Sequence, residues 1–434
     1  MVGRYTQAFR TRQLLETLDH AIAKSSFYQH HLGAFRHQVN SVDDLGVLPT
    51  IGKEHLARHG LEMRTSKAFP IRFGISSGST WGDFRPGEPG DSLSSLVDPA
   101  ISFQTLQEMA AMRHIQQRLF PQDSGNKSLT LQIISASHGI RYETSEDGYI
   151  HAPLESPFHY AHIKRLLRTR FDFDGYHPRI QNVAGGLNSI KLLSELIRHD
   201  PEKEKLDLRL ERVLVYGHHL TRFWNRRLEE VFACPVLNIY GISEMSGATG
   251  FQCECGSFHM PPFIIPEVIS LDRACRPVTQ GVGELVLTAL VPFTEYQPLI
   301  RYRTDDVVLQ SGACPQVPDM GILPLGKKTK TIQGPDYILP SFLLDEVLEK
   351  VPWVPKKIAE KFAVFFDSQP YGPPIYTVNH RPGKRMPVEI LIACNTPDRP
   401  SVSERARVVA EAGEKLLRID GSNVNQPLIE LIVT

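Results

Sequence analysis

Apolar residues near the start of the chain recur at helical spacing. Between residues 10 and 31 they are Leu14, Leu15, Leu18, Ala21, Ile22 and Phe27. Side chains at such intervals share one face of a helix, so we predict an amphipathic helix over 10–31. Segment 42–60 combines an acidic turn, a proline and a second short helical pattern, and 101–119 is helical in pattern again. The apolar run LTLQIISAS at 129–137 predicts a buried strand.

In the middle of the chain, two apolar runs that end in glycine flank a helical pattern. The runs are LERVLVYG at 210–217 and CPVLNIYG at 234–241, and LTRFWNRRLEEVF lies between them. A strand–helix–strand unit of this kind favours a parallel or mixed α/β sheet. Two further strands are predicted at 282–291 and 298–310, and we expect them to pair antiparallel.

The pattern changes after about residue 325. The basic polar stretch GKKTKT at 326–331 interrupts the apolar runs, and beyond it come KFAVFFD, PVEILIAC, a helical pattern at 401–419 and a final PLIELIVT. We therefore predict an α/β protein in two parts. The large N-terminal domain, 1–325, has mixed sheets, and the small C-terminal domain, 326–434, is α+β.

The composition limits the classes of partner. The 434 residues are 41% hydrophobic and 22% charged, with 48 basic and 48 acidic side chains. A neutral chain of this kind is not expected to bind nucleic acid or an anionic membrane. The N-terminal residues lack the apolar core of a signal peptide, and no run approaches the roughly 18 apolar residues of a membrane span. Six cysteines in so long a chain predict a reducing, cytoplasmic setting.

A loop rich in small residues is the first candidate for chemistry. Residues 73–86 read FGISSGSTWGDFRP, with no lysine between Lys67 and Lys127. Small residues let backbone N–H groups and hydroxyls surround an anion, so the loop is a candidate phosphate cradle. The alternative is an ordinary surface loop.

Four segments together resemble the adenylate-forming enzymes. FGISSGSTWG is similar to their phosphate loop, NIYGISEMSG (238–247) to their YG-x-[ST]-E motif, and GELVLT…PLIRYRTDD (283–306) to GELV-T…P-IRYRTGD. The opening LLETLDHAIAKSSFYQHHLG, followed by VDDLGVLPTIGKEHL, resembles the N-terminus of the phenylacetate–CoA ligase branch. The resemblance keeps the motif order over residues 10–350, and it implies the large and small domains of that family.

The resemblance also implies roles for individual residues. Ser76, Ser77, Gly78, Ser79 and Thr80 would surround the β- and γ-phosphates of ATP. Tyr240 would stack on adenine, Glu244 would hold Mg²⁺, and Asp306 would accept both ribose hydroxyls. The other nucleotide-site positions that it implies are Gly217, His218, Asn238 and Gly241.

Several positions depart from the family pattern. Asp305 replaces a glycine, Thr329 replaces a hinge carboxylate, and His218 replaces a glutamate. The family's late lysine, which stabilises the adenylation transition state, has no counterpart after Lys415, so we expect a shortened small domain. Three alternatives follow: slow adenylation without it, charge supplied by the basic hinge, or loss of catalysis with adenylate binding retained. Lys327 lies where the family usually has arginine, and Lys328 and Lys330 are its neighbours.

A second cluster has the ligand types of zinc. Cys253, Cys255 and His259 lie in FQCECGSFHM, and Cys314 follows the RYRTDD segment. Three thiols and an imidazole can form a closed tetrahedral structural zinc site. Some phenylacetate–CoA ligase-like proteins resemble this arrangement. The alternative is a set of unpaired reduced cysteines.

We therefore expect an AMP-forming ligase that uses ATP and Mg²⁺ to activate an aromatic or other small carboxylic acid. Coenzyme A is the first candidate acceptor, and an amine or a hydroxyl is the second. The third alternative is a protein that binds adenylates without catalysing a reaction. His218, His219 and Phe103 are candidates for lining the acid pocket, and a homodimer is left open.

Overall fold

The computed structural model describes most of the chain and places it in two compact units. The described residues are 7–66, 72–75, 101–104, 129–134, 149–172, 178–245, 247–272, 274–314, 319–334, 337–356, 365, 372–382, 384, 386–393, 400–418, 420–422, 424 and 429–433. Unit 1 comprises 1–126, 136–144 and 239–323, and unit 2 comprises 127–135, 145–238 and 324–434. Strands β7 and β13 each continue from one unit into the other.

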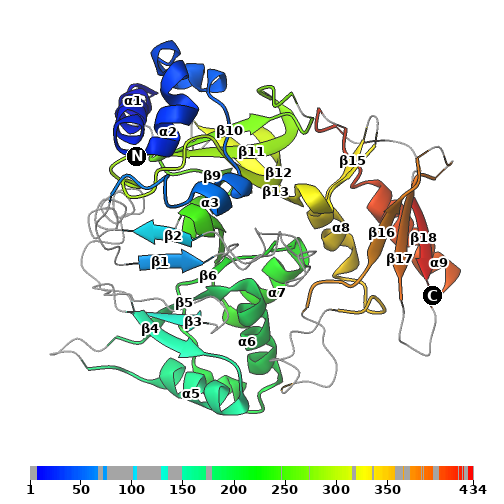
Figure 1. Cartoon of the computed structure of the whole chain (residues 1–434). Coiled ribbons are helices and arrows are strands. Elements are labelled where there is room, and N and C mark those ends of the chain that lie inside the picture. Colours follow the sequence, from blue (N-terminus) through cyan, green and yellow to red (C-terminus); the bar gives the residue numbers. More distant parts are fainter. Residues whose placement is uncertain are drawn as a thin grey trace, which may run out of the picture. The chain divides into compact units, whose positions relative to one another are not determined.

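Unit 1 combines N-terminal helices with antiparallel strands (Figure 1). Its described helices and strands are α1 (Gln7–Lys24), α2 (Ser26–Leu32), α3 (Lys53–His59), β1 (Arg72–Ile75), β2 (Ile101–Gln104), β7 (Val236–Ile242), β8 (Gly247–Gln252), β9 (Phe258–His259), β10 (Ile264–Ile269), β11 (Gly281–Ala289), β12 (Tyr302–Ala313) and β13 (Met320–Lys327). The strand order is β10-β11-β12-β13-β9-β8-β7. Strand β11 pairs antiparallel with β12, which confirms that prediction.

The predicted helix over 10–31 is interrupted at Ser25. This residue is extended (φ −119°, ψ 121°), and its hydroxyl accepts a hydrogen bond from the Tyr28 N–H, so it begins α2 as an N-cap. Apolar periodicity continues through such a break, which is why it did not indicate the interruption. The prediction of a helix at 101–119 is wrong at its start, since Ile101–Gln104 is a strand paired antiparallel with β1. Residues 105–119 lie outside the described ranges.

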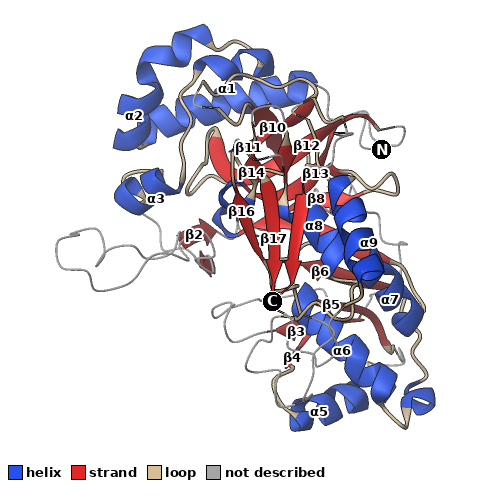
Figure 2. Ribbon diagram, turned by 90° about the vertical axis from the view of Figure 1, so that its right-hand side faces the viewer, coloured by secondary structure: helices blue, strands red, loops and turns tan. Residues whose placement is uncertain are grey.

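One hydrophobic core joins the N-terminal helices to the strands of unit 1. Fully buried leucines of α1 and α2, such as Leu18 and Leu32, share this core with Leu285 of β11. Polar contacts reinforce it, because Thr17 Oγ1 accepts the Val291 N–H (3.0 Å) and the Tyr28 hydroxyl donates to the Pro298 carbonyl (2.6 Å). Figure 2 shows α1 alongside β10 and β11. The N-terminal helices are therefore an integral part of unit 1.

Unit 2 contains parallel strands with helices between them. Its N-terminal elements are β3 (Leu129–Ile134), β4 (Tyr149–Pro153), α5 (Pro157–Arg168), β5 (Ile180–Gly186), α6 (Leu187–His199), β6 (Arg212–Tyr216) and α7 (Arg222–Phe232). Strand β3 pairs parallel with β4 and with β5, and β5 pairs parallel with β6. The α/β sheet predicted as parallel or mixed is confirmed as mixed, because it contains both parallel and antiparallel strand pairs.

The C-terminal segment of unit 2 is a small α+β assembly. Its elements are β14 (Ile332–Gln333), β15 (Ile338–Leu339), α8 (Ser341–Leu348), β16 (Thr377–His380), β17 (Val388–Ile392), α9 (Val402–Gly413) and β18 (Ile429–Val433). Strand β17 pairs antiparallel with β16 and parallel with β18. The predicted fold class, α/β with a small C-terminal α+β part, is confirmed, and the domain boundary near residue 325 stays a prediction.

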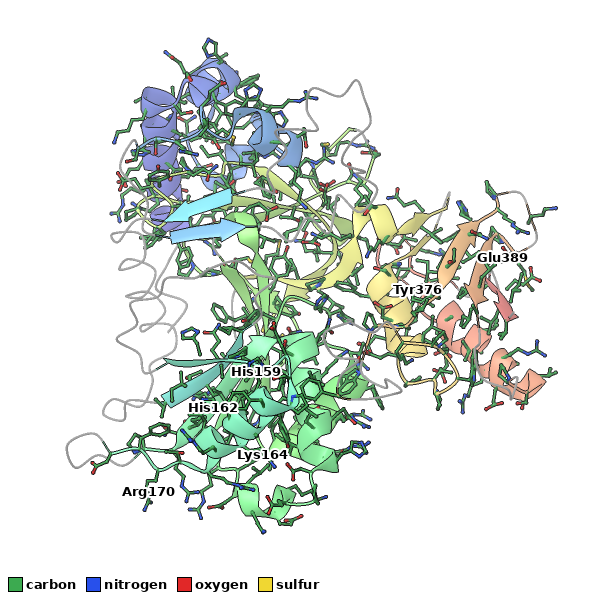
Figure 3. All side chains as sticks on the ribbon, turned by 60° about the horizontal axis from the view of Figure 1, so that its bottom comes forward. His159, His162, Lys164, Arg170, Tyr376 and Glu389 are labelled. Carbon is green, nitrogen blue, oxygen red and sulfur yellow. The ribbon has the colours of Figure 1, made fainter. Side chains whose placement is uncertain are left out.

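Tyr376 and Lys164, labelled in Figure 3, each bind a carboxylate that belongs to or follows a helix of unit 2. The Tyr376 hydroxyl donates to Asp345 of α8 (2.9 Å), and Lys164 of α5 pairs with Asp200 (2.8 Å). Burial raises the pKa of Asp345 to about 6, although the hydrogen bond from Tyr376 opposes this rise.

Among the described residues, we find no helix with the length and apolarity required to traverse a lipid bilayer.

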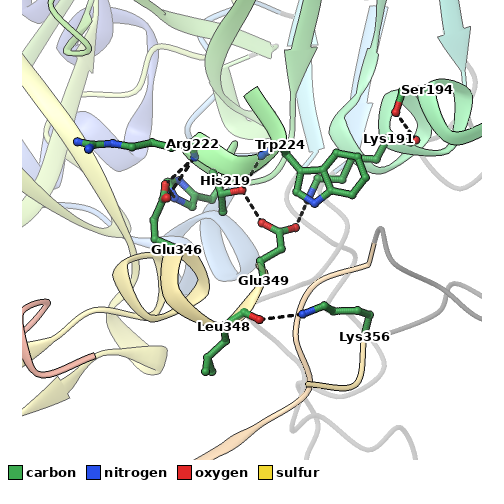
Figure 4. A network of polar contacts seen from close by, with 10 residues as sticks. Lys191, Ser194, His219, Arg222, Trp224, Glu346, Leu348, Glu349 and Lys356 are labelled. Carbon is green, nitrogen blue, oxygen red and sulfur yellow. Dashed lines mark hydrogen bonds and ion pairs between the residues drawn. The ribbon is translucent and has the colours of Figure 1, made fainter. Parts of the chain in front are cut away.

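A buried polar network attaches α8 to α6 and α7 within unit 2 (Figure 4). Glu349, directly after α8, pairs with Lys191 of α6 and accepts a hydrogen bond from Thr221 Oγ1 (2.6 Å). Thr221 is itself the N-cap of α7. One turn earlier, Glu346 accepts the Arg222 N–H at the start of α7 and lies 3.1 Å from His219 Nε2. Two carboxylates of the C-terminal segment thus face the positive end of the α7 dipole.

We predict that the Lys191–Glu349 pair dominates the stability of this contact. Lys191→Met leaves the buried Glu349 carboxylate without its cation, which should lower the free energy of unfolding by about 3–5 kcal/mol. Denaturant titration measures this loss, and the double variant Lys191→Met/Glu349→Gln should recover part of it. As a control, Lys350→Met removes an exposed pair with Glu411, at a cost of less than about 1 kcal/mol. A Lys191→Met loss no larger than that of the control would contradict the prediction.

Candidate functional site

The RYRTDD segment forms a bulge in β12. Residues Thr304–Asp306 face the single residue Leu285 of β11, because the register shifts at this point. Thr304 Oγ1 donates to the Leu285 carbonyl (2.9 Å) and accepts the Asp306 N–H (3.1 Å). Asp305, in the bulge, has a φ of 58°, which is the left-handed region. The aspartate therefore occupies the backbone conformation that a glycine would adopt more easily at this position.

The bulge places Asp306 against Tyr240 of β7. The Tyr240 hydroxyl donates a hydrogen bond to Asp306 Oδ2 (2.6 Å), and Asp306 is buried. Burial raises the pKa of Tyr240 well above its ordinary value, and the negative charge of Asp306 raises it further. The phenol therefore stays protonated and holds the carboxylate in one orientation.

Glu244 lies in a second cluster of polar groups in the same unit. It follows β7 in the short 3₁₀ helix Ser243–Met245, and its Oε1 accepts a hydrogen bond from the Tyr302 hydroxyl (2.9 Å). Lys53 Nζ, at the start of α3, lies 3.9 Å from the same oxygen, and the two side chains are only 14% and 6% exposed. Burial raises the pKa of Tyr302, so its hydroxyl remains a donor to the carboxylate.

The two arginines of the segment are structural. Arg303 makes two hydrogen bonds to the fully buried carboxylate of Glu284 (2.9 and 2.8 Å), and Arg301 pairs with Glu267 (3.0 Å). Burial raises the pKa of Glu267, although Arg301 opposes this rise. An arginine that makes two hydrogen bonds to one carboxylate fixes the orientation of both side chains and also compensates the negative charge. Arg303 therefore holds β12 against β11, and Arg301, directly before β12, binds a carboxylate of β10.

The sequence predicted roles for Tyr240, Glu244 and Asp306, which stay predictions, but it did not indicate the groups that contact Glu244. Tyr302 lies in the RYRTDD segment and Lys53 in the GKEHL segment, and the sequence predicted no role for either residue. The only local signal for Lys53 was its position, directly after a glycine and at the first position of a predicted helix. Its neighbour in space, however, is nearly two hundred residues away along the chain.

The remaining predicted nucleotide-site residues are placed as follows. Ser76, Ser77, Gly78, Ser79 and Thr80 lie outside the described residues, as does the side chain of Phe103. Gly241 lies on β7 in unit 1. Gly217, His218, Asn238 and Lys327 belong to unit 2: Gly217 has a φ of 86° after β6, His218 is exposed, Asn238 is buried in β7, and Lys327 ends β13. Their roles stay predictions.

Lys327 follows a position that requires glycine. Gly326 has a φ of 126°, and a Cβ atom there would lie 2.4 Å from Ser341 Oγ. Both features disfavour any larger residue. The predicted hinge therefore begins at a backbone position with a fixed, unusual conformation.

The four zinc-ligand candidates come together in unit 1. The ligand atoms of Cys253, Cys255, His259 and Cys314 all lie within 4.8 Å of one another. Cys253 Sγ is 3.3 Å from His259 Nε2 and 3.7 Å from Cys314 Sγ, and Cys255 Sγ is 3.3 Å from Cys314 Sγ. A tight turn allows this, because Cys253 N–H donates to the Ser257 carbonyl and Gly256 has a φ of 85°.

The spacing of these atoms suits a tetrahedral ion. Zn–S bonds of about 2.3 Å place two thiolate ligands about 3.8 Å apart, close to the separations seen here. A hydrogen bond from Cys253 lowers the pKa of Cys255 to about 6, whereas burial raises that of Cys253 to about 11. The cluster thus stabilises a thiolate, which is the form that binds metal. The residues fit a structural zinc site.

Comparisons with known proteins identify the fold. No family model matches the chain, and no curated protein gives a significant match. Among solved structures, the chain is similar to an open conformation of 2-hydroxyisobutyryl-CoA ligase in complex with 2-HIB-AMP and CoA (TM-score 0.65, 14% identity, 98% of this chain and 88% of that one). It is also similar to that ligase in the postadenylation state with R3-HIB-AMP (TM-score 0.65, 13% identity, 98% and 86%).

These structural neighbours are CoA ligases of the adenylate-forming superfamily. At such low identity the similarity shows the fold, which is the one that the sequence motifs implied. Assignment to the phenylacetate–CoA ligase branch stays a prediction.

We predict that substitutions at residue 305 change the stability of the protein according to the backbone strain in the β12 bulge. Asp305→Gly removes the penalty for a left-handed residue, whereas Asp305→Ala keeps that penalty without the carboxylate. The glycine variant should be more stable than the alanine variant by about 1 kcal/mol, with the wild type between them. Thermal and denaturant unfolding measure the order. An alanine variant as stable as the glycine variant would show that the bulge is not strained at this residue.

Proposed function

We propose that this protein is an AMP-forming acyl-CoA ligase. The observation that carries the proposal is a pair of carboxylates that each accept a hydrogen bond from a tyrosine hydroxyl: Asp306 from Tyr240 on β7, and Glu244 from Tyr302 on β12. The fold is shared with structures of an adenylate-forming CoA ligase, and fold alone does not assign a function. The oriented carboxylates are what supports the assignment of a nucleotide site.

The proposed roles follow from the chemistry of each group. Asp306, fixed by Tyr240, would accept hydrogen bonds from the ribose hydroxyls, and the ring of Tyr240 would lie against adenine. The Ser76–Thr80 loop would surround the β- and γ-phosphates. Glu244 provides the hard oxygen ligand that Mg²⁺ prefers. When bound, Mg²⁺ neutralises phosphate charge as the reaction proceeds.

The proposed reaction has two transfers. A substrate carboxylate oxygen attacks the α-phosphorus of ATP, and the bond to pyrophosphate breaks, which gives an acyl adenylate. The thiol of coenzyme A, after losing its proton, attacks the acyl carbon and releases AMP as the thioester forms. This chain's residues position the reactants and stabilise charge on phosphate oxygens, which is the main source of catalysis in such transfers.

The finer assignments are also proposals. We favour an aromatic or other small carboxylic acid as the substrate, and Lys327, Lys328 or Lys330 as a cation near the α-phosphate during adenylation. An amine or hydroxyl acceptor, or adenylate binding without catalysis, are the alternatives. Incubation with ATP, Mg²⁺ and a panel of acids, with coenzyme A or with an amine or hydroxyl acceptor added in parallel reactions, separates the three when mass spectrometry measures acyl adenylate, thioester, and amide or ester.

We also propose that Cys253, Cys255, His259 and Cys314 hold one structural zinc ion. Four protein ligands would fill the tetrahedral coordination of zinc, so no position remains for water and the site would stabilise rather than catalyse. Its support is the geometry of the cluster and the turn at Gly256.

We predict that Glu244→Gln abolishes acid-dependent pyrophosphate release. The amide conserves shape but removes the negative charge that would bind the metal. A loss of a hundredfold or more, on the order of 3 kcal/mol in the barrier, is expected. The control Glu211→Gln alters an exposed carboxylate of unit 2 and should retain full activity. A folded Glu244→Gln protein with unchanged pyrophosphate release would refute the role of this residue.

Metal analysis should find about one zinc per chain. Cys253→Ser and Cys314→Ser should each lower the zinc content and the melting temperature, because each removes a ligand. Cys275→Ser, outside the cluster, is the matched control and should change neither. If protein purified without chelators contains no zinc, the zinc site is wrong.

A further inference from the structure

Three histidines surround one phenylalanine where α2 and α3 meet in unit 1. The Phe27 ring stacks on His31 of the same helix, with the centroids 5.0 Å apart and an interplanar angle of 21°. It also lies 6.1 Å from the ring of His55 and 5.3 Å from that of His59, both on α3. The His31 and His55 rings are 5.6 Å apart. These four residues, which we call the ring cluster, thus include three side chains that can gain a positive charge near neutral pH.

His55 Nδ1 has two neighbours that require opposite protonation states. It accepts a hydrogen bond from the Gly52 N–H (3.1 Å) and so caps the start of α3, and it also lies 3.1 Å from Glu54 Oε1. An imidazole nitrogen accepts a hydrogen bond only without a proton, whereas it donates to a carboxylate oxygen only with one. Protonation of His55 therefore exchanges the cap of α3 for a pair with an exposed carboxylate, which contributes little stability.

His31 lies in surroundings that disfavour its charged form. Its Nε2 is buried and has no hydrogen-bond partner among the described residues. Burial lowers the pKa of His31 below its ordinary value of 6.5, and the charge of His55 lowers it further, against a hydrogen bond to the Thr50 backbone. As the pH falls through 6.5, the unfolded chain therefore binds this proton more readily than the folded chain, and the fold loses stability.

The charged groups around the ring cluster do little to offset this effect. Glu54 and Glu62 are 59% and 56% exposed, and Glu62 Oε2 lies 3.4 Å from His59 Nδ1. Solvent screens the attraction of such exposed carboxylates for a protonated ring. Glu295, after β11, acts on His20 of α1. The other charged or titratable nitrogen groups of α2, α3, the last turn of α1 and residues 33–38 and 60–66 are all basic: Lys24, His30, Arg36, His37, Lys53, Arg58 and Arg64.

The ring cluster also contacts the segment that pairs with the start of β12. His31 is hydrogen-bonded to the Thr50 backbone, and Ile51 follows directly. The Ile51 N–H donates to the Arg301 carbonyl (3.0 Å), and the Arg303 N–H donates to the Ile51 carbonyl (2.8 Å). The next residue along the chain is the glycine whose N–H His55 accepts. Protonation of the two histidines therefore acts on both sides of this backbone pairing.

We infer that the ring cluster is an acid-sensitive switch, which holds α3 on α2 while its imidazoles are neutral and releases α3 when they gain protons. Positive charges on neighbouring rings repel each other, and the cap of α3 is lost at the same time. The release weakens the attachment of residues 50–52 to β12, beside the tyrosine that contacts Glu244. The switch is a property of unit 1 and does not depend on the proposed function.

Hydrogen exchange of the full chain, measured by mass spectrometry, tests the switch at pH ~7.5 and pH ~5.5, on either side of the ordinary histidine pKa. Exchange is corrected for its intrinsic dependence on pH. Peptides that cover residues 50–59 should lose about fivefold or more of their protection at the lower pH, the factor that corresponds to one N-cap hydrogen bond. Strand β11, in the same unit and without a histidine, is the internal reference and should keep its protection.

Two variants separate the switch from a structural role of the rings. His55→Asn keeps an acceptor oxygen near the position of Nδ1 but has no imidazole to protonate, so it should retain most of the protection at pH ~5.5. The matched control is His30→Asn, which alters an exposed histidine of α2 outside the ring cluster and should lose protection as the wild type does.

The wild type alone can contradict the inference, whether or not the variants fold. Equal protection of residues 50–59 at the two pH values would overturn the switch. A folded His55→Asn protein that loses as much protection as the wild type would overturn it as well, because the loss would then not depend on the titration of His55.

Discussion

The hydrogen bonds around the β12 bulge are the interaction on which the candidate site depends. Thr304 bridges the bulge by donating to β11 and accepting the Asp306 N–H, and this places the Asp306 carboxylate beside the Tyr240 hydroxyl. Just before the bulge, Tyr302 orients Glu244. The two arginines on either side of Tyr302 are bound to glutamates of β10 and β11, so the strand has little freedom to shift. A bulge is a common means of aiming a side chain away from regular alternation.

A second set of charges connects the C-terminal segment to the rest of unit 2. Glu346 and Glu349 bind the start of α7 and Lys191 of α6, and they come from one short stretch around the end of α8. Any rotation about the predicted hinge near Lys327 that separates α8 from α7 would expose these groups to water. Because a buried pair regains hydration when it opens, such a separation costs less than the short contacts suggest.

Much of the fold and part of the site could be predicted from the sequence. Runs such as LERVLVYG and GELVLT carry strand periodicity within themselves, and the zinc-ligand candidates were found because residue type and local spacing are informative for metals. The break at Ser25 could not be found in this way, since apolar spacing continues across it. Lys53 and Glu349 act on partners more than a hundred residues away. Such contacts depend on tertiary packing, which no local pattern encodes.

The central claim is that the carboxylates beside β7 and β12 form a nucleotide site. A crystal structure of the protein with Mg²⁺ and a non-hydrolysable ATP analogue tests it most directly. We expect the ribose hydroxyls at Asp306, the adenine against Tyr240, and the metal bound by Glu244. An analogue bound at a different place, or with Asp306 and Glu244 both distant from it, would contradict the claim.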